Sequence, residues 1–195
     1  MEFTPAVVQE FKYEMARREF FYYCHLQAPN FYKKEREYLV HLCDEIQNFY
    51  EDPKQKVLIM NMPPRHGKSR TAQMAVKWIL GKNPIEKIMT GSYNTTLSTT
   101  FAKNVRNDIQ EVKADKNRVV YTDIFPNVRI KRGDASMDMW SLEGGYNSYL
   151  ATSPSGTATG FGATILIIDD IIKNAEDAYN ENTKAKHWDW FTNTM

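Results

Sequence analysis

Three residues suited to binding a polyphosphate stand together in the run Gly67-Lys68-Ser69. A glycine lets backbone N–H groups approach an anion, a lysine can reach the β- and γ-phosphates of a nucleotide, and a serine hydroxyl can ligate Mg²⁺. A helix starting here would add its positive end. We therefore predict a phosphate-binding loop within residues 61–69. The residues expected to contact nucleotide are Pro64, Arg65, His66, Gly67, Lys68, Ser69 and Arg70.

The elements on either side must hold this loop in place. The apolar run Val57–Met60 predicts a strand that leads into the loop. Apolar residues at helical spacing between Lys68 and Leu80 predict a helix that follows it. Met62 departs from the usual pattern, which has a glycine at that position. A chance Gly-Lys-Ser on an ordinary loop is the alternative, so a second motif is needed.

A second motif lies a hundred residues further on. Thr164–Ile168 is a continuous apolar run that predicts a strand buried on both faces, and it ends in Asp169 and Asp170. Two adjacent carboxylates at the end of a central strand are costly unless a cation sits beside them. We expect Ser69, and Asp169 through water, to hold Mg²⁺, and Asp170 to orient or deprotonate the attacking water. The alternative is that the two carboxylates cap the segment that follows.

Composition sets limits on the fold and on the classes of function. The chain has 195 residues, of which 42% are apolar, as in an ordinary globular domain. A net charge of +1 argues against nucleic-acid binding through bulk positive charge. Cys24 and Cys43 form neither a disulfide framework nor a zinc site, so buried free thiols in a reducing cytoplasm are expected. The sequence predicts no membrane span, and the N-terminus from Met1 to Pro5 lacks the features of a signal peptide.

Residues 1–52 predict a helical lid or brace ahead of the core, which occupies residues 53–195. Thr4 and Pro5 begin the first helix, which has Val8, Phe11 and Met15 on one face and extends to the aromatic cluster at residues 20–23. Residues 28–30 break it. A second helix ends near Asp52, and its apolar stripe comprises Leu39, Leu42, Cys43 and Ile46.

The core alternates between strand and helix. Lys87–Thr90 predicts a second strand, and helical spacing from Leu97 to Val112 predicts the next helix. This alternation implies an α/β fold with a mostly parallel sheet and helices on its faces. Met137–Leu142 and Asn147–Ala151 predict an inserted β-hairpin, and residues 152–162 a loop rich in Ser, Thr and Gly.

The chain resembles the ATPase part of a large terminase, the DNA-packaging motor subunit of tailed bacteriophages and prophages. The segments that carry the resemblance are Met62–Ser69, Gly91–Asn94, Thr159–Ala163, Leu166–Asp170 and Trp188–Phe191. The resemblance implies a P-loop NTPase of the additional-strand, RecA-like type that hydrolyses ATP. Arg65 matches an arginine that would contact the γ-phosphate; from the residues alone, it could also pin the loop to a neighbouring carboxylate.

The same resemblance implies partners and a location. The expected partners are double-stranded DNA, a portal and a small terminase subunit, in the cytoplasm of a bacterial host. A ring of identical subunits is expected on the procapsid, with a monomer in solution as the alternative.

Three features depart from the family's pattern. Asp170 stands where many terminases have glutamate, and Ser155–Gly162 lacks the arginine that many carry before the second motif. The family also has a coupling strand between the phosphate-loop strand and the Asp169 strand, and this sequence does not reach it. We therefore expect a fragment of a longer protein that also lacks the family's nuclease domain.

Other residues are weaker candidates. Residues 92–94 could contact nucleic acid, although a plain turn is favoured. Solvated surface is likewise favoured for the basic residues Lys103, Arg106, Lys113, Lys131 and Arg132. Gln27 and Tyr32 are guesses for contacts to adenine, and Trp78, Trp188 and Phe191 are expected to pack internally.

Together with the two motifs, the resemblance to large terminases implies the ATPase portion of a motor that drives double-stranded DNA into a procapsid. Lys68, Arg65 and Asp170 are the expected catalytic residues. A helicase-like motor with the same core is one alternative. A module that binds nucleotide without hydrolysing it is the other.

Overall fold

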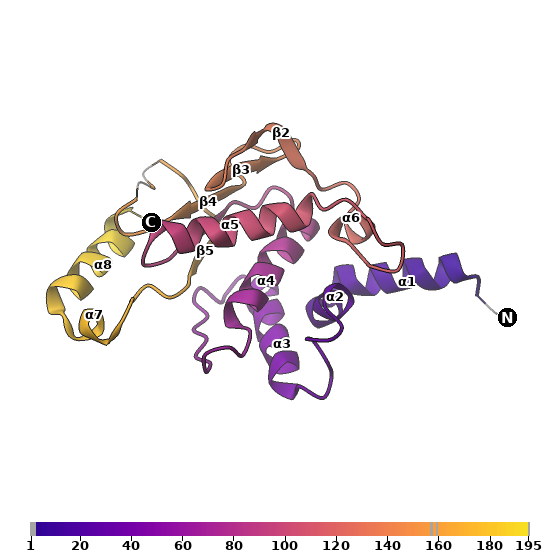
Figure 1. The fold of residues 1–195 in the computed structure, drawn as a ribbon, viewed down its shortest axis with the longest axis horizontal. Coiled ribbons are helices and arrows are strands. Elements are labelled where there is room, and N and C mark those ends of the chain that lie inside the picture. Colours follow the sequence, from indigo (N-terminus) through magenta and orange to yellow (C-terminus); the bar gives the residue numbers. More distant parts are fainter. Residues whose placement is uncertain (1–2, 157, 159, 195) are drawn as a thin grey trace. The chain divides into compact units, whose positions relative to one another are not determined.

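The computed structural model describes residues 3–156, 158 and 160–194, which form two compact units (Figure 1). The first unit contains the described residues up to Lys82 together with Gln110–Asn127. The second contains Asn83–Ile109 and the described residues from Val128 onward. The phosphate loop therefore belongs to the first unit, and Asp169 and Asp170 belong to the second. The expected division at residue 52 stays a prediction.

The first unit is helical. Its helices are α1 (Pro5–Arg18), α2 (Phe20–Gln27), α3 (Glu37–Glu51), α4 (Lys68–Lys82) and the short α6 (Tyr121–Ile124). The predicted start of α1 is confirmed, because the Thr4 side chain accepts a hydrogen bond from the Val7 N–H and Pro5 occupies the first turn. The stripe predicted for α3 is also confirmed, since Leu39, Leu42, Cys43 and Ile46 are the buried residues of that helix.

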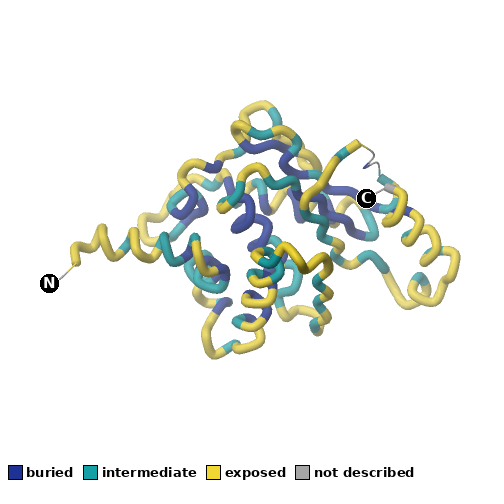
Figure 2. The backbone as a smooth tube through the Cα atoms, turned by 180° about the vertical axis from the view of Figure 1, so that it is seen from behind, coloured by how far each residue is buried: buried dark blue, intermediate teal, exposed yellow. Residues whose placement is uncertain are grey.

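The predicted end of α1 is wrong. The helix does not continue to residue 23, because Glu19 is extended and separates α1 from α2. The helix next to the N-terminus is mostly exposed (Figure 2), and its apolar face includes Phe11, which is 66% exposed, and Val8, which is 42% exposed. Helical spacing in the sequence marks residues on a common face, but burial requires a neighbouring element to cover that face.

Aromatic residues fill the core of the first unit. Trp78 is fully buried, as predicted, and its Nε1–H donates to the carbonyl oxygen of Ala16. Its ring lies 5.3 Å from the ring of Phe20. The Tyr121 hydroxyl is also buried and donates to the carbonyl oxygen of Lys77. These contacts hold α4 against the neighbouring helices.

The second unit is built on a sheet with strand order β2-β3-β4-β1-β5. Its elements are β1 (Ile88–Gly91), α5 (Thr95–Ile109), β2 (Ile130–Ala135), β3 (Met139–Leu142), β4 (Tyr149–Thr152), β5 (Ile165–Ile168), α7 (Ala175–Tyr179) and α8 (Glu181–Thr194). β1 pairs in parallel with both β4 and β5, and β3 pairs in antiparallel with β2 and β4. Because α5 packs on β4 and β1, the predicted α/β class is confirmed (Figure 1).

The predicted β-hairpin corresponds to β3 and β4. It belongs to the central sheet, since β4 continues that sheet by pairing with β1. The rings of Trp140 and Tyr149 stack at 4.7 Å across the β3–β4 pair, and the Tyr149 hydroxyl lies 2.8 Å from the Thr90 hydroxyl on β1. These two cross-strand contacts, which share Tyr149, thus link three neighbouring strands.

Two strand predictions need correction. Val57–Met60 forms no strand, and Val57 and Ile59 are 76% and 79% exposed. β5 is a strand as expected, but its residues are half-buried or exposed, and Ile168 is 40% exposed. Among the described residues β5 has one neighbour, β1, so its other edge has no strand beside it. An apolar run becomes a buried strand only where neighbouring strands pair with it.

The last helices expose aromatic residues. Trp188 is 67% exposed and Phe191 is 39% exposed, so internal packing was the wrong prediction for both. Trp190 is the buried residue of this segment. None of the described helices is long and apolar enough to span a membrane.

Candidate phosphate-binding site

The predicted loop makes a tight turn before α4. Arg65 and Gly67 both have left-handed backbone angles, with φ values of 65° and 92°. α4 then begins at Lys68, as the sequence predicted. The Thr71 N–H donates to the Gly67 carbonyl oxygen at 2.8 Å and closes the first helical turn.

Position 67 requires a glycine for two reasons. A φ of 92° is strained for any residue with a side chain. In addition, a Cβ at this position would lie 2.6 Å from Cζ and 2.9 Å from Cε1 of Phe31. The loop backbone therefore lies directly against the Phe31 ring, closer than any other residue type would permit.

The start of α4 supplies the donors that an anion needs. The N–H groups of Lys68, Ser69 and Arg70 lie in the first turn, where an α-helix provides no carbonyl acceptors of its own. Lys68 and Ser69 are half-buried, whereas Arg65, His66 and Arg70 are exposed. Backbone donors, the helix dipole and several cations together favour a bound anion at this end of the helix.

His66 makes contacts within the loop and with α3. Its Nδ1 lies 2.9 Å from the carbonyl oxygen of Pro64, and because that oxygen can only accept, Nδ1 carries the proton in this contact. Its ring meets the ring of Tyr38 edge to face at 5.7 Å. The imidazole therefore braces the turn at residues 64–67.

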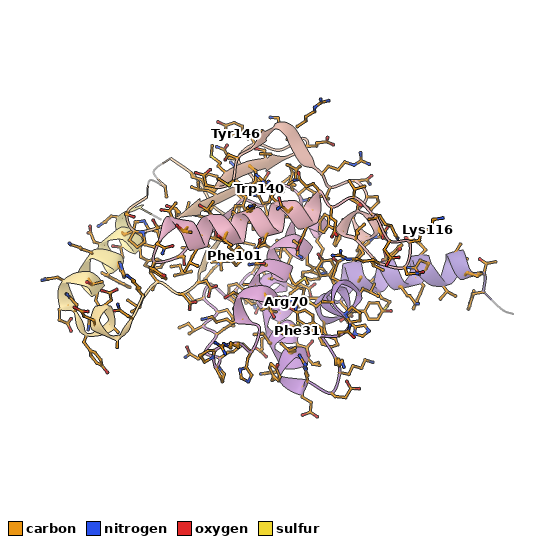
Figure 3. The ribbon with its side chains drawn as sticks, in the orientation of Figure 1. Phe31, Arg70, Phe101, Lys116, Trp140 and Tyr146 are labelled. Atoms are coloured by element: carbon orange, nitrogen blue, oxygen red, sulfur yellow. The ribbon has the colours of Figure 1, made fainter. Side chains whose placement is uncertain are left out.

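Phe31, in the segment between α2 and α3, was not predicted as part of this site. The Arg70 guanidinium lies 4.6 Å from the centre of the Phe31 ring, and Figure 3 labels both side chains. The Arg36 guanidinium lies 5.2 Å from the same ring centre. Phe31 and Tyr32 are followed by the basic residues Lys33, Lys34 and Arg36, but nothing in that run points to a glycine in the distant loop.

Tyr32 was a guess for an adenine contact, and the structure argues against it. Its side chain is fully buried and its hydroxyl lies 3.0 Å from the Thr71 hydroxyl. Burial raises the pKa of Tyr32 well above its usual range. The ring is part of the core and offers no open face to a base. Gln27, the other guess, donates from Nε2 to the Val119 carbonyl oxygen at 3.4 Å.

Asp169 and Asp170 lie at the carboxyl end of β5 in the second unit. The Asp169 N–H donates to the Gly91 carbonyl oxygen, and the Tyr93 N–H donates to the Asp170 carbonyl oxygen. Both carboxylates follow β5, which runs parallel to β1. The two strands end at the same sheet edge, where open α/β sheets bind ligands. Asp170 has a φ of 49°, a left-handed conformation that Asp and Asn adopt more readily than most residues.

Residues 92–94 connect β1 to α5 at this edge. The Asn94 side chain accepts a hydrogen bond from the Leu97 N–H and thereby caps α5, as expected of a turn before a helix. The Thr95 and Ser153 hydroxyls lie 3.0 Å apart. The second contact joins the start of α5 to the segment that follows β4.

Two of the basic residues take part in internal contacts. Arg106 donates from Nη1 to the carbonyl oxygens of Ala135 and Ser136, and thus fastens α5 to the end of β2. Lys113 pairs with Asp123 at 2.8 Å. Plain solvated surface was the wrong interpretation for half-buried Arg106, whereas Lys113 is exposed, as expected of a surface residue.

The residues expected to hold Mg²⁺ have suitable chemistry. A serine hydroxyl and a carboxylate are oxygen donors, the kind that Mg²⁺ prefers. Ser69 belongs to the first unit and Asp169 belongs to the second. In the part of the chain that the structure describes, no three His, Cys, Asp or Glu residues gather as a metal site. Thr159, which begins one segment of the terminase resemblance, lies outside the described residues.

Comparisons with known proteins add no family. A scan of protein-family models and a search of curated proteins each found no match to this chain.

Proposed function

We propose that this protein binds ATP through the loop at residues 64–70 and hydrolyses it. The observation that carries the proposal is the turn with left-handed Arg65 and Gly67, followed at once by the start of α4 at Lys68. A loop of this shape directs backbone N–H groups toward one point at the positive end of a helix. That arrangement suits the phosphates of a nucleotide.

Each residue of the loop has a role in this proposal. Gly67 allows the backbone to approach the phosphates, and Lys68 neutralises charge on the β- and γ-phosphates. Arg65, which is exposed at the turn, contacts the γ-phosphate and adds to this neutralisation. Ser69 binds Mg²⁺ through its hydroxyl, and the ion would offset charge that develops on the phosphates.

The second unit contributes the residues for hydrolysis. Asp169 would hold Mg²⁺ through water, and Asp170 positions the attacking water and accepts its proton. The supporting observation is that both residues follow β5 directly, at the sheet edge where the parallel strand β1 also ends.

In this proposal, ATP hydrolysis drives the movement of double-stranded DNA into a procapsid, as it does in the ATPase portion of a terminase large subunit. Its partners would be DNA, a portal and a small terminase subunit in the cytoplasm of a bacterial host, with subunits assembled as a ring. The resemblance of five sequence segments supports this part of the proposal. The additional-strand type of P-loop fold belongs to the same proposal, and β5 with one described neighbour is compatible with it.

The test is ATP turnover by the protein with and without double-stranded DNA. We expect turnover that DNA stimulates and that Lys68→Ala abolishes. Lys54→Ala, which removes an exposed lysine outside the loop, is the matched control and should leave turnover unchanged. Turnover that survives Lys68→Ala would show that the phosphate-loop assignment is wrong.

Binding without hydrolysis is a second candidate function, and one observation favours it. All residues assigned to phosphate binding lie in the first unit, whereas Asp169 and Asp170 lie in the second. Nucleotide binding measured by calorimetry, without phosphate release, would support this candidate, and robust release would exclude it. A strand-separation assay distinguishes the helicase-like alternative, because a terminase should move along duplex DNA without unwinding it.

A further inference from the structure

We propose that Phe31 is a positioning residue for the phosphate-binding loop, holding the turn at Gly67 and directing the Arg70 guanidinium toward the phosphates of a bound nucleoside triphosphate. This inference rests on the proposed function. It assigns a role to a segment outside the loop, between α2 and α3.

The first contact is between the Phe31 ring and the loop backbone. The absence of a Cβ at Gly67 lets the ring occupy space that a side chain would fill, and the nearest ring atoms would be 2.6 Å and 2.9 Å from that Cβ. The same position would lie 3.9 Å from Cδ2 of Leu39 on α3. Gly67 is therefore supported from the segment preceding α3 and from α3 itself.

The second contact is between the ring and two cations. An aromatic face attracts a guanidinium within about 6 Å of its centre. Arg70 lies 4.6 Å and Arg36 lies 5.2 Å from the ring centre. Among the described residues, no carboxylate pairs with Arg70, which is exposed in the first turn of α4. Its charge is held in place by the ring and is left available for an anion.

The ring is itself held in a fixed place. The Phe31 N–H donates to the Ala28 carbonyl oxygen, and the Phe31 carbonyl oxygen accepts from the Lys33 N–H and from Nη1 of Arg36. The next residue, Tyr32, is buried, and its hydroxyl contacts Thr71 on α4. The consecutive aromatic residues Phe31 and Tyr32 thus both pack against the first turns of α4.

The consequence concerns affinity for phosphate. In free solution an arginine side chain samples many rotamers, and fixing one of them on binding costs conformational entropy. Stacking on Phe31 restricts Arg70 before the nucleotide arrives, so less entropy is lost on binding. Loss of the aromatic face should therefore weaken nucleotide binding without changing the charge of the site.

The test compares Phe31→Leu, Phe31→Tyr and Arg70→Ala by calorimetry with Mg-ATP, and records the thermal unfolding midpoint of each variant. We expect Phe31→Leu to weaken binding on the order of fivefold, the size of an exposed cation–π contact. Phe31→Tyr keeps the aromatic face, so this variant should bind Mg-ATP with an affinity close to that of the wild type. Phe11→Leu removes an exposed ring on α1 and serves as the matched control.

A double variant makes the result specific. If Phe31 acts through Arg70, Phe31→Leu should have little further effect in an Arg70→Ala background. Arg70→Lys gives an independent result: it keeps the charge but loses the planar group, so it should bind more weakly than wild type and more tightly than Arg70→Ala.

Two outcomes overturn the inference. One is Phe31→Leu binding Mg-ATP as tightly as wild type while Lys68→Ala does not, which leaves the proposed function standing. The other is equal loss in Phe31→Leu and Phe31→Tyr with lowered unfolding midpoints in both, which would indicate a purely structural role. If Lys68→Ala also binds as wild type, the proposed function fails instead.

Discussion

The hydroxyl groups of Tyr32 and Thr71 lie 3.0 Å apart in the core of the first unit, 39 residues apart in sequence. This contact ties the segment before α3 to the first turns of α4. Tyr32→Phe removes the hydroxyl and leaves the ring in place. We expect the free energy of unfolding to fall by about 1 kcal/mol, the net value of a buried hydrogen bond. Urea denaturation of both proteins measures the difference.

Tyr38→Phe is the control for that experiment, because Tyr38 is 42% exposed and its hydroxyl has no described partner. It should change the urea midpoint little. A Tyr32→Phe variant as stable as wild type would mean that the hydroxyl contributes nothing to holding the loop's helix in place.

Buried tyrosines should resist ionisation. Burial raises the pKa of Tyr121 and of Tyr149 well above the usual range, which favours the neutral phenol in the folded state. Their contribution to stability is complete below the unfolded-state pKa of about 10 and is lost as the pH rises above it. An ultraviolet titration should show exposed tyrosines ionising first and the buried ones only as the protein unfolds in alkali. Simultaneous ionisation of all the tyrosines in a folded protein would contradict the burial of these two.

The two cysteines should be unreactive in the folded protein. Both are buried free thiols, and burial, followed by the neighbouring Cys43 thiol, raises the pKa of Cys24. Because the thiolate is the reactive form, a thiol reagent near neutral pH should label neither cysteine until the chain unfolds. In denaturant, both thiols of each chain should be labelled. Rapid labelling without denaturant would show that α2 and α3 are not packed as described.

The substitution Asp170→Asn tests the role of this residue in hydrolysis without straining the backbone. Its φ of 49° is left-handed, and asparagine accepts that conformation about as well as aspartate. Asp170→Asn should therefore fold normally and still bind nucleotide, while ATP turnover falls on the order of a hundredfold or more, as expected for loss of a general base. Asp134→Asn on β2 is the matched control. Wild-type turnover in Asp170→Asn would remove this residue from the mechanism.

The features that the sequence predicted correctly are those determined by interactions between residues close together in the chain. The Thr4 cap, the apolar stripe of α3 and the start of α4 at Lys68 all follow from residues a few positions apart. The α/β class followed from the alternation of apolar strands with helical spacing. For the same reason, the order β5-Asp169-Asp170 was predictable from a single run of apolar residues.

Features that depend on distant partners could not be predicted. Val57–Met60 has strand-forming residues, yet a strand exists only when its backbone groups find neighbours. The exposed faces of α1 and α8 reflect the absence of a covering element among the described residues, which spacing alone cannot reveal. Phe31 was overlooked because its importance comes from the missing Cβ of a glycine 36 residues away in the sequence.

Equilibrium binding of Mg-ATP, measured by calorimetry on wild type and Lys68→Ala, tests the central claim most directly. A loop with left-handed Arg65 and Gly67 at the start of α4 should bind one nucleotide per chain, and loss of the Lys68 ammonium should abolish detectable binding. Lys54→Ala should bind as wild type. Absence of binding in the wild type, or equal binding in Lys68→Ala, would contradict the assignment of residues 64–70 as a phosphate-binding loop.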